Sequence, residues 1–534
     1  MRLPDPGRLA LRKPIPADSR QSGHTGKSID AGSGSRHVVC SARWRGCTVW
    51  VVERREFRTD SPLTRRGFLS GVSAPVALTL AGATRGDAAP PPPNIVFILA
   101  DDMGYGDVGC YGQQRIRTPH IDRIAAEGMR FTQFYSGSTV CSPSRCSLMT
   151  GLHTGHSRVR GNDCLAGGSM PPGTQGARAI RRMYLLESDR TVGNYLQKAG
   201  YRTGLIGKWH LDAYEPTAGP LDRGFDEFYG WLIQTAGRTG GYFPTQRHRN
   251  RELVDIPENQ GGKHVAYEGD LTTHDACDFI RRNAQRPFFL YVSPNMPHSP
   301  IIAPSQGSYA NQPWSDDCRT YAAMVEQFDN CVGSVLQTLK ELRLEERTIV
   351  FAASDNGPRS EPTAQLTAIA EFFDSNGPFR GYKRDLYEGG IRVPMVVRWP
   401  GRIPKGRTSA LPAYFADFLP TAVQLAGQRP PALDGISLVG ELTGQPRRTP
   451  DRFLYWEFYE GGFSQAVRWG EWKAVRLRPG APLELFRSPP ELYRLTTDVG
   501  ERRNVAADQP KIVARIEAYL RTARTQSPEY PIPS

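Results

Sequence analysis

The feature that most constrains the fold of this chain is a series of short, uninterrupted apolar runs. The first is NIVFILA at residues 94–100, and others lie at 202–206, 287–292, 348–353 and 393–399. Because these runs do not alternate with polar residues, they are typical of strands buried on both faces of a largely parallel sheet. They exclude a collagen-like or coiled-coil chain.

Helical patterns alternate with these runs. Residues 118–128 open with Thr-Pro and stop at Gly, and residues 191–200 behave similarly. The clearest helix is predicted over residues 316–342, where apolar residues keep an alternating four- and three-residue spacing. Strands alternating with helices predict an α/β fold: a large mixed, mostly parallel sheet sandwiched by helices, with ligands bound at the carboxyl ends of the strands.

The pattern of predicted secondary structure changes after about residue 440. Residues 464–475 and 491–495 predict short antiparallel strands, and residues 512–522 predict a closing helix. We therefore expect a main domain over 94–440 and a small α+β C-terminal domain, an antiparallel-sheet subdomain, over 441–534.

The net charge of +13 is distributed unevenly. Residues 1–93 hold 15 Lys or Arg against 7 Asp or Glu, whereas the remaining residues hold 52 against 47. Most of the excess positive charge thus lies in residues 1–93, the head of the chain. The mildly basic body suits an anionic substrate and lacks the block of positive charge expected of a nucleic-acid binder.

The head contains a candidate export signal. Residues 1–60 are rich in Arg, Gly, Ser and Pro without any period, which indicates a disordered leader or translation from a start codon too far upstream. In the segment 61–93, TRRGFLS at 64–70 precedes a modest apolar stretch and a proline linker, an order that resembles a twin-arginine signal; the alternative is a chance Arg pair. The apolar stretch is shorter than the roughly 20 residues of a membrane span. The prediction is a bacterial protein, periplasmic or secreted through the twin-arginine export machinery, without a transmembrane span in its mature form.

Polar pairs follow two of the predicted strands. Asp101 and Asp102 follow the first run directly, and Asp355 and Asn356 follow the run at 348–353. At the carboxyl edge of one sheet these oxygens would converge on a hard cation such as Ca²⁺ or Mg²⁺ rather than Zn²⁺. The alternative is that each pair only caps a turn.

A third polar element is CSPSRCSLMTG at residues 141–151. Pro143 suits the first turn of a helix, which places Cys141 at the helix N-terminus, where backbone N–H groups favour an anion. Arg145 lies one turn further on, so both side chains can face one site. The pattern indicates an activated Cys that handles an oxyanion.

This segment, together with GYRTGLIGKWH at 200–210, resembles the two signatures of the type I, formylglycine-dependent sulfatases, which are arylsulfatase-like enzymes of the alkaline-phosphatase superfamily. The resemblance extends from Asn94 into the C-terminal domain and includes NMPH at 295–298 and YEGG at 387–390. It implies an alkaline-phosphatase-like fold and a sulfuric ester hydrolase that acts on a sulfated carbohydrate or an aryl sulfate.

The resemblance also implies cofactors. A formylglycine-generating or sulfatase-maturating enzyme would oxidise Cys141 to Cα-formylglycine, whose hydrated aldehyde is the nucleophile. One Ca²⁺ per chain would be held by Asp101, Asp102, Asp355 and Asn356 and would contact the modified Cys141.

Further roles follow from the resemblance. Arg145 and His210 would hold the hydrate, and His210 would take its proton. Lys208, His298 and Lys383 would bind the sulfate group, with His298 protonating the leaving oxygen. The contact that relatives make some twenty residues after the second signature has no clear counterpart, and Gln234 is only a candidate for it.

Two other functions remain open at this stage. One is a phosphodiesterase or phosphonate monoester hydrolase of the same superfamily, and the other is an exported glycan-binding protein with an inactive site. Two loops, 167–182 and 240–263, carry basic residues that would grip a sulfated or carboxylated glycan or would simply be exposed: Arg178, Arg181, Arg182, Arg247, His248 and Arg249.

Overall fold

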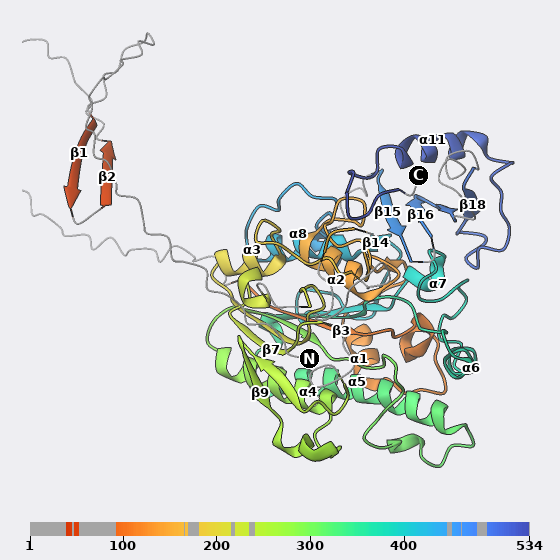
Figure 1. Cartoon of the computed structure of the whole chain (residues 1–534), viewed down its shortest axis with the longest axis horizontal. Helices are drawn as coiled ribbons and strands as arrows, with labels where there is room; N and C mark the ends of the chain where they lie inside the picture. The colour runs from red at the N-terminus through yellow and green to blue at the C-terminus, as the bar shows by residue number, and fades with distance from the viewer. Residues whose placement is uncertain are drawn as a thin grey trace, which may run out of the picture. The chain divides into compact units, whose positions relative to one another are not determined.

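The computed structural model (Figure 1) describes residues 92–164, 166–168, 181–214, 219–233, 241–445, 451–460, 462–477 and 489–532. It also describes the backbone of two strands that pair antiparallel, β1 (Val39–Trp44) and β2 (Cys47–Val52). These belong to a compact unit, Met1–Gly86, that is separate from the unit Asp87–Ser534. The rest of residues 1–91, including the candidate twin-arginine signal, lies outside the described residues.

The larger unit is built on a ten-stranded sheet in the order β13-β4-β12-β11-β3-β10-β6-β7-β8-β9. The run from β11 to β7 is parallel, and the strands on either side add antiparallel pairs. The strands are β3 (Asn94–Ala100), β4 (Met129–Phe131), β6 (Arg202–Lys208), β7 (Glu227–Trp231), β8 (Gln246–Arg249), β9 (Glu252–Asp255), β10 (Phe288–Ser293), β11 (Thr348–Ser354), β12 (Met395–Arg398) and β13 (Arg407–Ser409). A short parallel pair joins β5 (Phe134–Tyr135) to β14 (Ala413–Tyr414).

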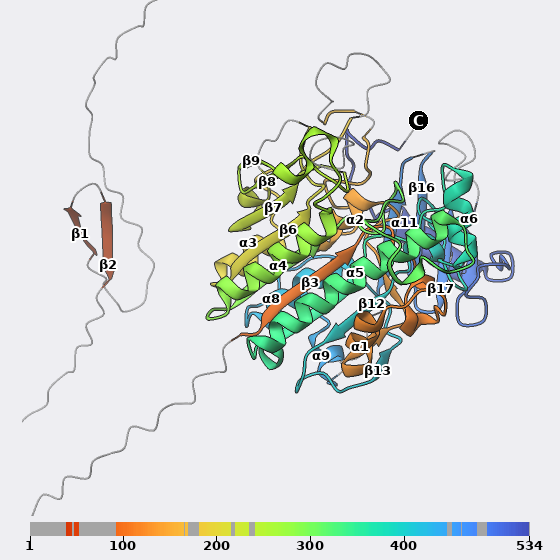
Figure 2. The same cartoon turned by 90° about the horizontal axis from the view of Figure 1, so that it is seen from below.

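Helices cover both faces of this sheet (Figures 1 and 2). Ile95, Phe97 and Leu99 of β3 pack in one apolar cluster, and Val96 and Ile98 pack in another, because successive side chains of a strand point to opposite faces. The first cluster includes α2 (Cys141–Thr150), α3 (Val192–Lys198) and α8 (Phe418–Leu425), and the second includes α1 (Pro119–Glu127), α4 (Glu268–Asn283) and α5 (Asp316–Glu341). Other helices are α6 (Ala364–Phe372), α7 (Glu388–Ile391) and α9 (Val439–Leu442).

The long helix α5 forms where its apolar stripe predicts it. Ser315 caps its N-terminus by accepting a hydrogen bond from the Cys318 backbone N–H, and Asp316 and Asp317 lie in the first turn, where acidic residues favour the helix dipole. The residues of the predicted stripe are buried except at its C-terminal end, where the helix stops at Glu341.

A separate four-stranded antiparallel sheet lies near the C-terminus, as predicted. It consists of β15 (Phe453–Phe458), β16 (Ser464–Trp469), β17 (Trp472–Arg476) and β18 (Glu491–Arg494). One face packs against α11 (Pro510–Leu520), and the other packs against Tyr135, Leu386 and Tyr414 of the main unit. The fold class predicted from the sequence is therefore confirmed.

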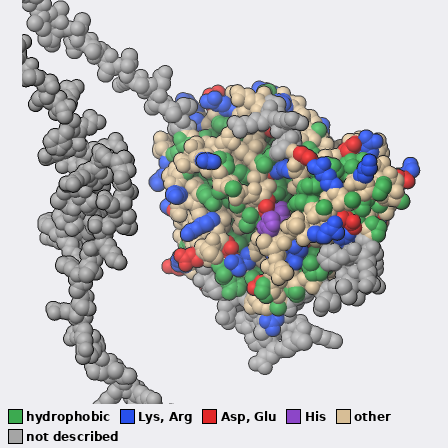
Figure 3. All heavy atoms as spheres, turned by 90° about the horizontal axis from the view of Figure 1, so that it is seen from above, with side chains coloured by type: hydrophobic (Ala, Val, Ile, Leu, Met, Phe, Trp, Pro, Cys, Tyr) green, Lys and Arg blue, Asp and Glu red, His purple; other side chains and the backbone are tan. Residues whose placement is uncertain are grey.

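The part of the chain that the structure describes contains no helix with the length and apolar character needed to cross a bilayer. On the face drawn in Figure 3, Lys and Arg side chains are interspersed with neutral and acidic ones.

Candidate active site

The carboxyl ends of four parallel strands bring the predicted site residues to one edge of the sheet. Ala100 of β3 pairs with Ser354 of β11, so the polar pairs that follow these strands start side by side. In the same way, Gly207 of β6 pairs with Ser293 of β10, which places Lys208 next to the end of β10. The register of the parallel strands therefore brings together residues that lie far apart in the sequence.

The two polar pairs interlock. The Asp102 backbone N–H donates to Oδ1 of Asp355 at 3.1 Å, and the Asn356 amide donates to Oδ1 of Asp102 at 2.8 Å. Asp102 has φ +65°, a left-handed conformation that is uncommon for a non-glycine residue. Three buried oxygens have no hydrogen-bond donor among the described residues: Oδ1 of Asp101, Oδ2 of Asp102 and Oδ1 of Asn356. Since buried acceptors are normally satisfied, these oxygens suit a hard cation.

Cys141 is the first residue of α2, as predicted, and its side chain is buried. The next backbone N–H, that of Ser142, donates to Oδ1 of Asn162 at 3.1 Å. The Lys383 ammonium lies 3.5 Å from the Cys141 sulfur. Burial raises the pKa of the Cys141 thiol, although Lys208 and Lys383 act in the opposite direction. The unmodified residue is therefore a neutral thiol and a weak nucleophile.

Arg145 projects from α2 onto the strand ends. Its Nε and Nη2 donate to Oδ2 of Asp355 at 3.0 and 2.8 Å, and Nη2 lies 3.7 Å from Oδ2 of Asp101. Its Nη1 donates to the hydroxyls of Tyr291 and Ser293. Burial opposes the charge of Arg145, but Tyr291 and Asp355 keep its pKa above the ordinary value. All three guanidinium nitrogens are thus engaged, and the side chain holds Asp355 in place.

Two lysines and a histidine meet the aspartates. Lys208 and Lys383 lie 2.5 Å from Oδ2 of Asp101 and Oδ1 of Asp102, respectively. His298 Nε2 lies 3.6 Å from Oδ2 of Asp102. Burial lowers the pKa of His298 to about 4, although Asp102 opposes this shift. The site therefore presents two ammonium groups and a neutral imidazole around one pair of carboxylates.

His210 is hydrogen-bonded through its backbone to the residue that follows Cys141. Its backbone carbonyl accepts a hydrogen bond from the Ser142 hydroxyl at 2.8 Å, and neither ring nitrogen has a partner among the described residues. Burial, together with Lys208 and Arg182, holds the pKa of His210 well below its ordinary value. The ring is therefore neutral, and its nitrogens are free of partners among the described residues, although its lowered pKa makes it a weak base.

The structure brings the predicted site residues into one buried cluster, each between 0 and 8 % exposed. Ligand atoms of Asp101, Asp102, Cys141 and His298 lie within 4.8 Å of one another, a spacing that would allow a shared metal ion. Gln234 and Arg178 lie outside the described residues.

Sequence reasoning missed the residues that position the cluster. The Tyr242 hydroxyl donates to the backbone carbonyls of Asn295, at 2.9 Å, and His298, and Oε2 of buried Glu268 accepts from the Asn295 N–H at 3.0 Å. These contacts fix the loop that carries His298. For Tyr291 and Ser293, whose hydroxyls hold Arg145, the sequence does carry a signal. They are polar residues at alternate positions of an apolar run, which places both on one face of β10.

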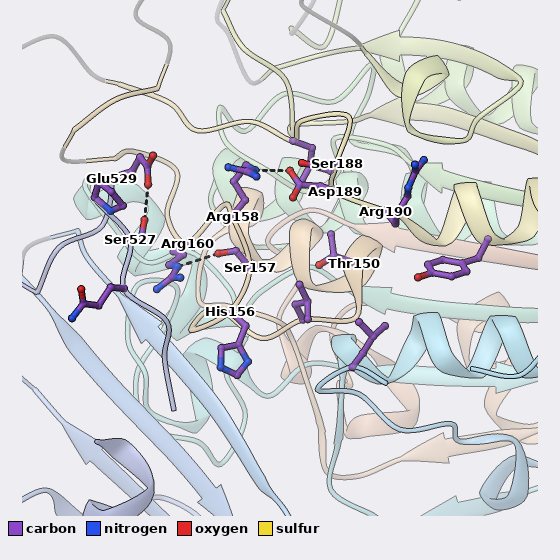
Figure 4. Close-up of a pocket in the computed structure, with 16 residues that line it drawn as sticks. Thr150, His156, Ser157, Arg158, Arg160, Ser188, Asp189, Arg190, Ser527 and Glu529 are labelled. Carbon is purple, nitrogen blue, oxygen red and sulfur yellow. Dashed lines mark hydrogen bonds and ion pairs between the residues drawn. The ribbon is translucent and has the colours of Figure 1, made fainter. Parts of the chain in front are cut away.

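A separate cavity of about 490 Å³ lies at the opposite end of α2 (Figure 4). Thr150, the last residue of α2, lines it, whereas Cys141 is the first, so the two lie roughly 14 Å apart at about 1.5 Å per residue. Its charges are largely paired within the protein: Arg158 lies 2.5 Å from Asp189, and Arg160 lies 3.1 Å from Glu457. This cavity is not the catalytic site.

The fold and this cluster define a hydrolase of the alkaline-phosphatase superfamily. The sulfatase family profile matches residues 93–428, and that of the N-sulphoglucosamine sulphohydrolase C-terminal region matches residues 377–526. The chain belongs to the sulfatase family and is a sulfuric ester hydrolase.

Named relatives agree. The chain is 36% identical over 419 residues to the N-acetylgalactosamine-6-sulfatase of Canis lupus familiaris, with 74% of each chain covered. It is 30% identical over 544 residues to the steryl-sulfatase of Mus musculus, with 82% of this chain and 83% of that one covered. Among solved structures, Ps i-CgsB superposes with a TM-score of 0.68 at 27% identity, covering 83% of this chain and 95% of that one, and it has also been solved with k-i-k-neocarrahexaose.

Proposed function

We propose that the protein hydrolyses sulfate esters with a Cα-formylglycine made from Cys141 by a separate maturation enzyme, and with one Ca²⁺ per chain. The observation that carries this proposal is the environment of Cys141: a buried neutral thiol at a helix N-terminus, surrounded by cations and by carboxylates with unsatisfied oxygens. Such a thiol is poorly suited to attack sulfur, so the chemistry calls for a modified residue.

The proposed Ca²⁺ ligands are Asp101, Asp102, Asp355 and Asn356. Their chemistry fits, because Ca²⁺ prefers carboxylate and amide oxygens, and three of these oxygens have no hydrogen-bond donor in the described part of the chain. When bound, the ion would act as a Lewis acid and as a template for a sulfate oxygen.

A hydrated aldehyde at position 141 would supply one hydroxyl that attacks sulfur and a second whose deprotonation expels sulfate. Lys208 and Lys383 would bind the sulfate oxygens, since both ammonium groups already face anionic oxygens at this site. His298 would donate a proton to the leaving alcohol oxygen, because the charge of a bound sulfate opposes the effect of burial on its pKa. His210, neutral and unpaired, would take the proton of the second hydroxyl. Arg145 would act by fixing Asp355.

We favour a sulfated carbohydrate as the substrate. A relative that is 36% identical is named for N-acetylgalactosamine 6-sulfate, and a structural neighbour at 27% identity binds an oligosaccharide. The steryl-sulfatase relative supports a steryl or aryl sulfate as the second candidate. A desulfation screen over N-acetylgalactosamine 6-sulfate, other sugar sulfates and an aryl sulfate decides between them.

The mechanism is tested by measuring the mass of the peptide that contains residue 141 beside the specific activity of the same preparation. Activity should track the fraction of formylglycine, Cys141→Ala should lose essentially all turnover, and protein made without a maturation enzyme should fold and be nearly inert. Full activity with an unmodified thiol would overturn the mechanism. Faster turnover of a phosphodiester than of every sulfate ester would instead favour the related phosphodiesterases.

The proposed metal is tested by metal analysis of active protein. One Ca²⁺ per chain is expected, and Asp355→Ala should abolish turnover with the fold largely retained. Two Zn²⁺ per chain in active protein would contradict the proposal.

Export and domain roles complete the proposal. We take residues 94–440 as the catalytic domain, 441–534 as the C-terminal subdomain, and 61–93 as a twin-arginine signal with a proline linker, which directs the protein to the periplasm or the medium. Replacing Arg65 and Arg66 with Lys should trap the protein in the cytoplasm, since this signal is read by a receptor. Unchanged export would remove that assignment.

A further inference from the structure

The basic residues of the two candidate loops have different environments. Arg247 is fully buried, its Nη2 donates to the Thr272 hydroxyl at 3.0 Å, and it lies 4.4 Å from the Tyr229 ring. Its Nε and Nη1 also lack a hydrogen-bond partner among the described residues, but its charge acts on the buried carboxyl of Glu268. Arg181 is partly exposed and donates to the Gly167 carbonyl. Arg182 is 7 % exposed, and its Nε and Nη1 are buried without any hydrogen-bond partner among the described residues.

We propose that Arg182 binds a second anionic group of the substrate, a carboxylate or a further sulfate, next to the ester that is hydrolysed. This inference rests on the proposed function of the site. It adds that the natural substrate carries at least two negative groups and that Arg182 selects for the second.

The backbone connects Arg182 to the nucleophile. Asn162 accepts a hydrogen bond from the Ser142 N–H beside Cys141, and two residues further on the Cys164 N–H donates to the Arg181 carbonyl at 2.8 Å. Arg182 therefore follows a residue that is hydrogen-bonded to the segment 162–164, and that segment contacts the start of α2. The guanidinium lies 5.3 Å from the Tyr214 ring centroid. Its charge also reaches the buried His210 ring, consistent with this placement.

The energetics favour a missing anion. A buried charge without a partner is costly, and the face of one aromatic ring compensates only part of that cost. Two other buried arginines pair closely with carboxylates, Arg145 with Asp355 at 2.8 Å and Arg160 with Glu457 at 3.1 Å. Among the described residues Arg182 has no such ion pair, although its charge lowers the pKa of Asp163 against the larger effect of burial. The planar donors of a guanidinium match both carboxylate and sulfate oxygens, so either group would satisfy Arg182. The sulfate under attack already faces Lys208 and Lys383 in our proposal, which leaves Arg182 for a neighbouring group.

The test measures binding to full-length Cys141→Ala protein, so it does not depend on turnover. Three ligands share one sulfate ester: N-acetylgalactosamine 6-sulfate, N-acetylgalactosamine 4,6-disulfate, and a disaccharide in which a uronic acid is linked to N-acetylgalactosamine 6-sulfate. We expect the parent to bind one of the two doubly charged ligands at least about tenfold more tightly than the first, as for a desolvated charge-assisted contact. Which of the two it prefers identifies the second group as sulfate or carboxylate.

Arg182→Met should remove this preference, and Arg182→Lys should retain part of it. Arg181→Met is the matched control, since it removes a neighbouring guanidinium that already has a backbone partner, and it should keep the preference. The midpoint of thermal unfolding of Arg182→Met should be unchanged or higher, because the variant removes a buried charge that has no ion pair among the described residues.

The inference is overturned if the parent shows no preference, if Arg182→Met weakens all three ligands equally, or if Arg182→Met unfolds at a clearly lower temperature, which would mark a structural role. If Cys141→Ala protein shows the binding preference but wild-type protein carrying formylglycine desulfates none of the three ligands, the proposed reaction is contradicted and the role of Arg182 is not.

Discussion

At the scale of single residues, the site balances opposite charges before any ligand binds. Arg145, Lys208 and Lys383 face Asp101, Asp102 and Asp355 in a volume from which water is largely excluded. A divalent cation added to this balanced set makes it positive, and an anionic ester is then attracted into it. The same residues thus explain how the site would select both a cation and an anionic substrate.

The Tyr242 hydroxyl provides a test of how His298 is positioned. Tyr242→Phe removes the donor to the Asn295 and His298 carbonyls and little else. We expect kcat to fall about tenfold and stability to fall by about 1 kcal/mol, since one net hydrogen bond is lost while the ring is kept. Tyr267→Phe is the control: its ring stacks on Tyr242 at 5.4 Å, but its hydroxyl donates to the carbonyl of Ile302, four residues beyond His298, and not to the Asn295 or His298 carbonyls. An equal loss of kcat in both variants would contradict the positioning role.

Reasoning from the sequence named the residues to which our proposal gives chemical roles, and it missed those that hold other side chains in place. Asp101, Cys141 and Lys208 stand in recognisable motifs at the ends of predicted elements. Tyr242 and Glu268 contact the His298 loop only because the chain returns to it after folding, and no local pattern carries that information. That Nε and Nη1 of Arg182 have no hydrogen-bond partner in the described part of the chain is likewise a property of three-dimensional packing.

At the scale of elements, apolar runs predicted burial correctly but not direction. The run at 393–399 becomes β12, whose residues are all buried, yet β12 is antiparallel to β11. Burial on both faces removes the alternation that would distinguish the two pairings. Strand β15 also lacks a separate prediction, although it pairs with β16 along its whole length.

The attachment of α2 to β11 leads to a prediction for two serines of one helix. The Ser144 hydroxyl donates to the Asp355 carbonyl at 2.5 Å and accepts from the Gly137 N–H at 3.1 Å, whereas the buried Ser147 hydroxyl has no partner among the described residues. Ser144→Ala should therefore cost about 1–3 kcal/mol and lower activity by displacing Asp355, because it leaves two buried backbone groups unsatisfied. Ser147→Ala should be neutral or slightly stabilising. Denaturation of both variants checks this, and equal destabilisation would contradict the assignment.

At the scale of the whole molecule, buried charges join the C-terminal sheet to the main unit. Lys473 of β17 lies 2.9 Å from Glu388 and 3.2 Å from Glu501, and the Glu388 N–H donates to Oε2 of Glu501. Glu388 belongs to the YEGG segment that follows Lys383. The cluster therefore connects the small sheet to the part of the chain that carries a site lysine.

This cluster predicts a specific dependence of stability on pH. Burial raises the pKa of Glu501 from 4.5 to about 7, although Lys473 opposes the shift. Folded protein therefore binds this proton more tightly than unfolded protein, so the stabilisation is complete below pH 4.5 and is lost as the pH rises through about 7.

Glu501→Gln removes this titration. Between pH 5 and pH 8 the unfolding midpoint of the wild type should therefore fall by roughly a few degrees more than that of Glu501→Gln, measured by thermal unfolding in matched buffers. Glu471→Gln is the control, because the hydrogen bond from Arg494 lowers the pKa of Glu471 and its titration contributes at more acidic pH. That variant should follow the wild type. If the unfolding midpoint of Glu501→Gln falls as far as that of the wild type, Glu501 is not the group that titrates. The cluster then joins the C-terminal sheet to the main unit without responding to pH.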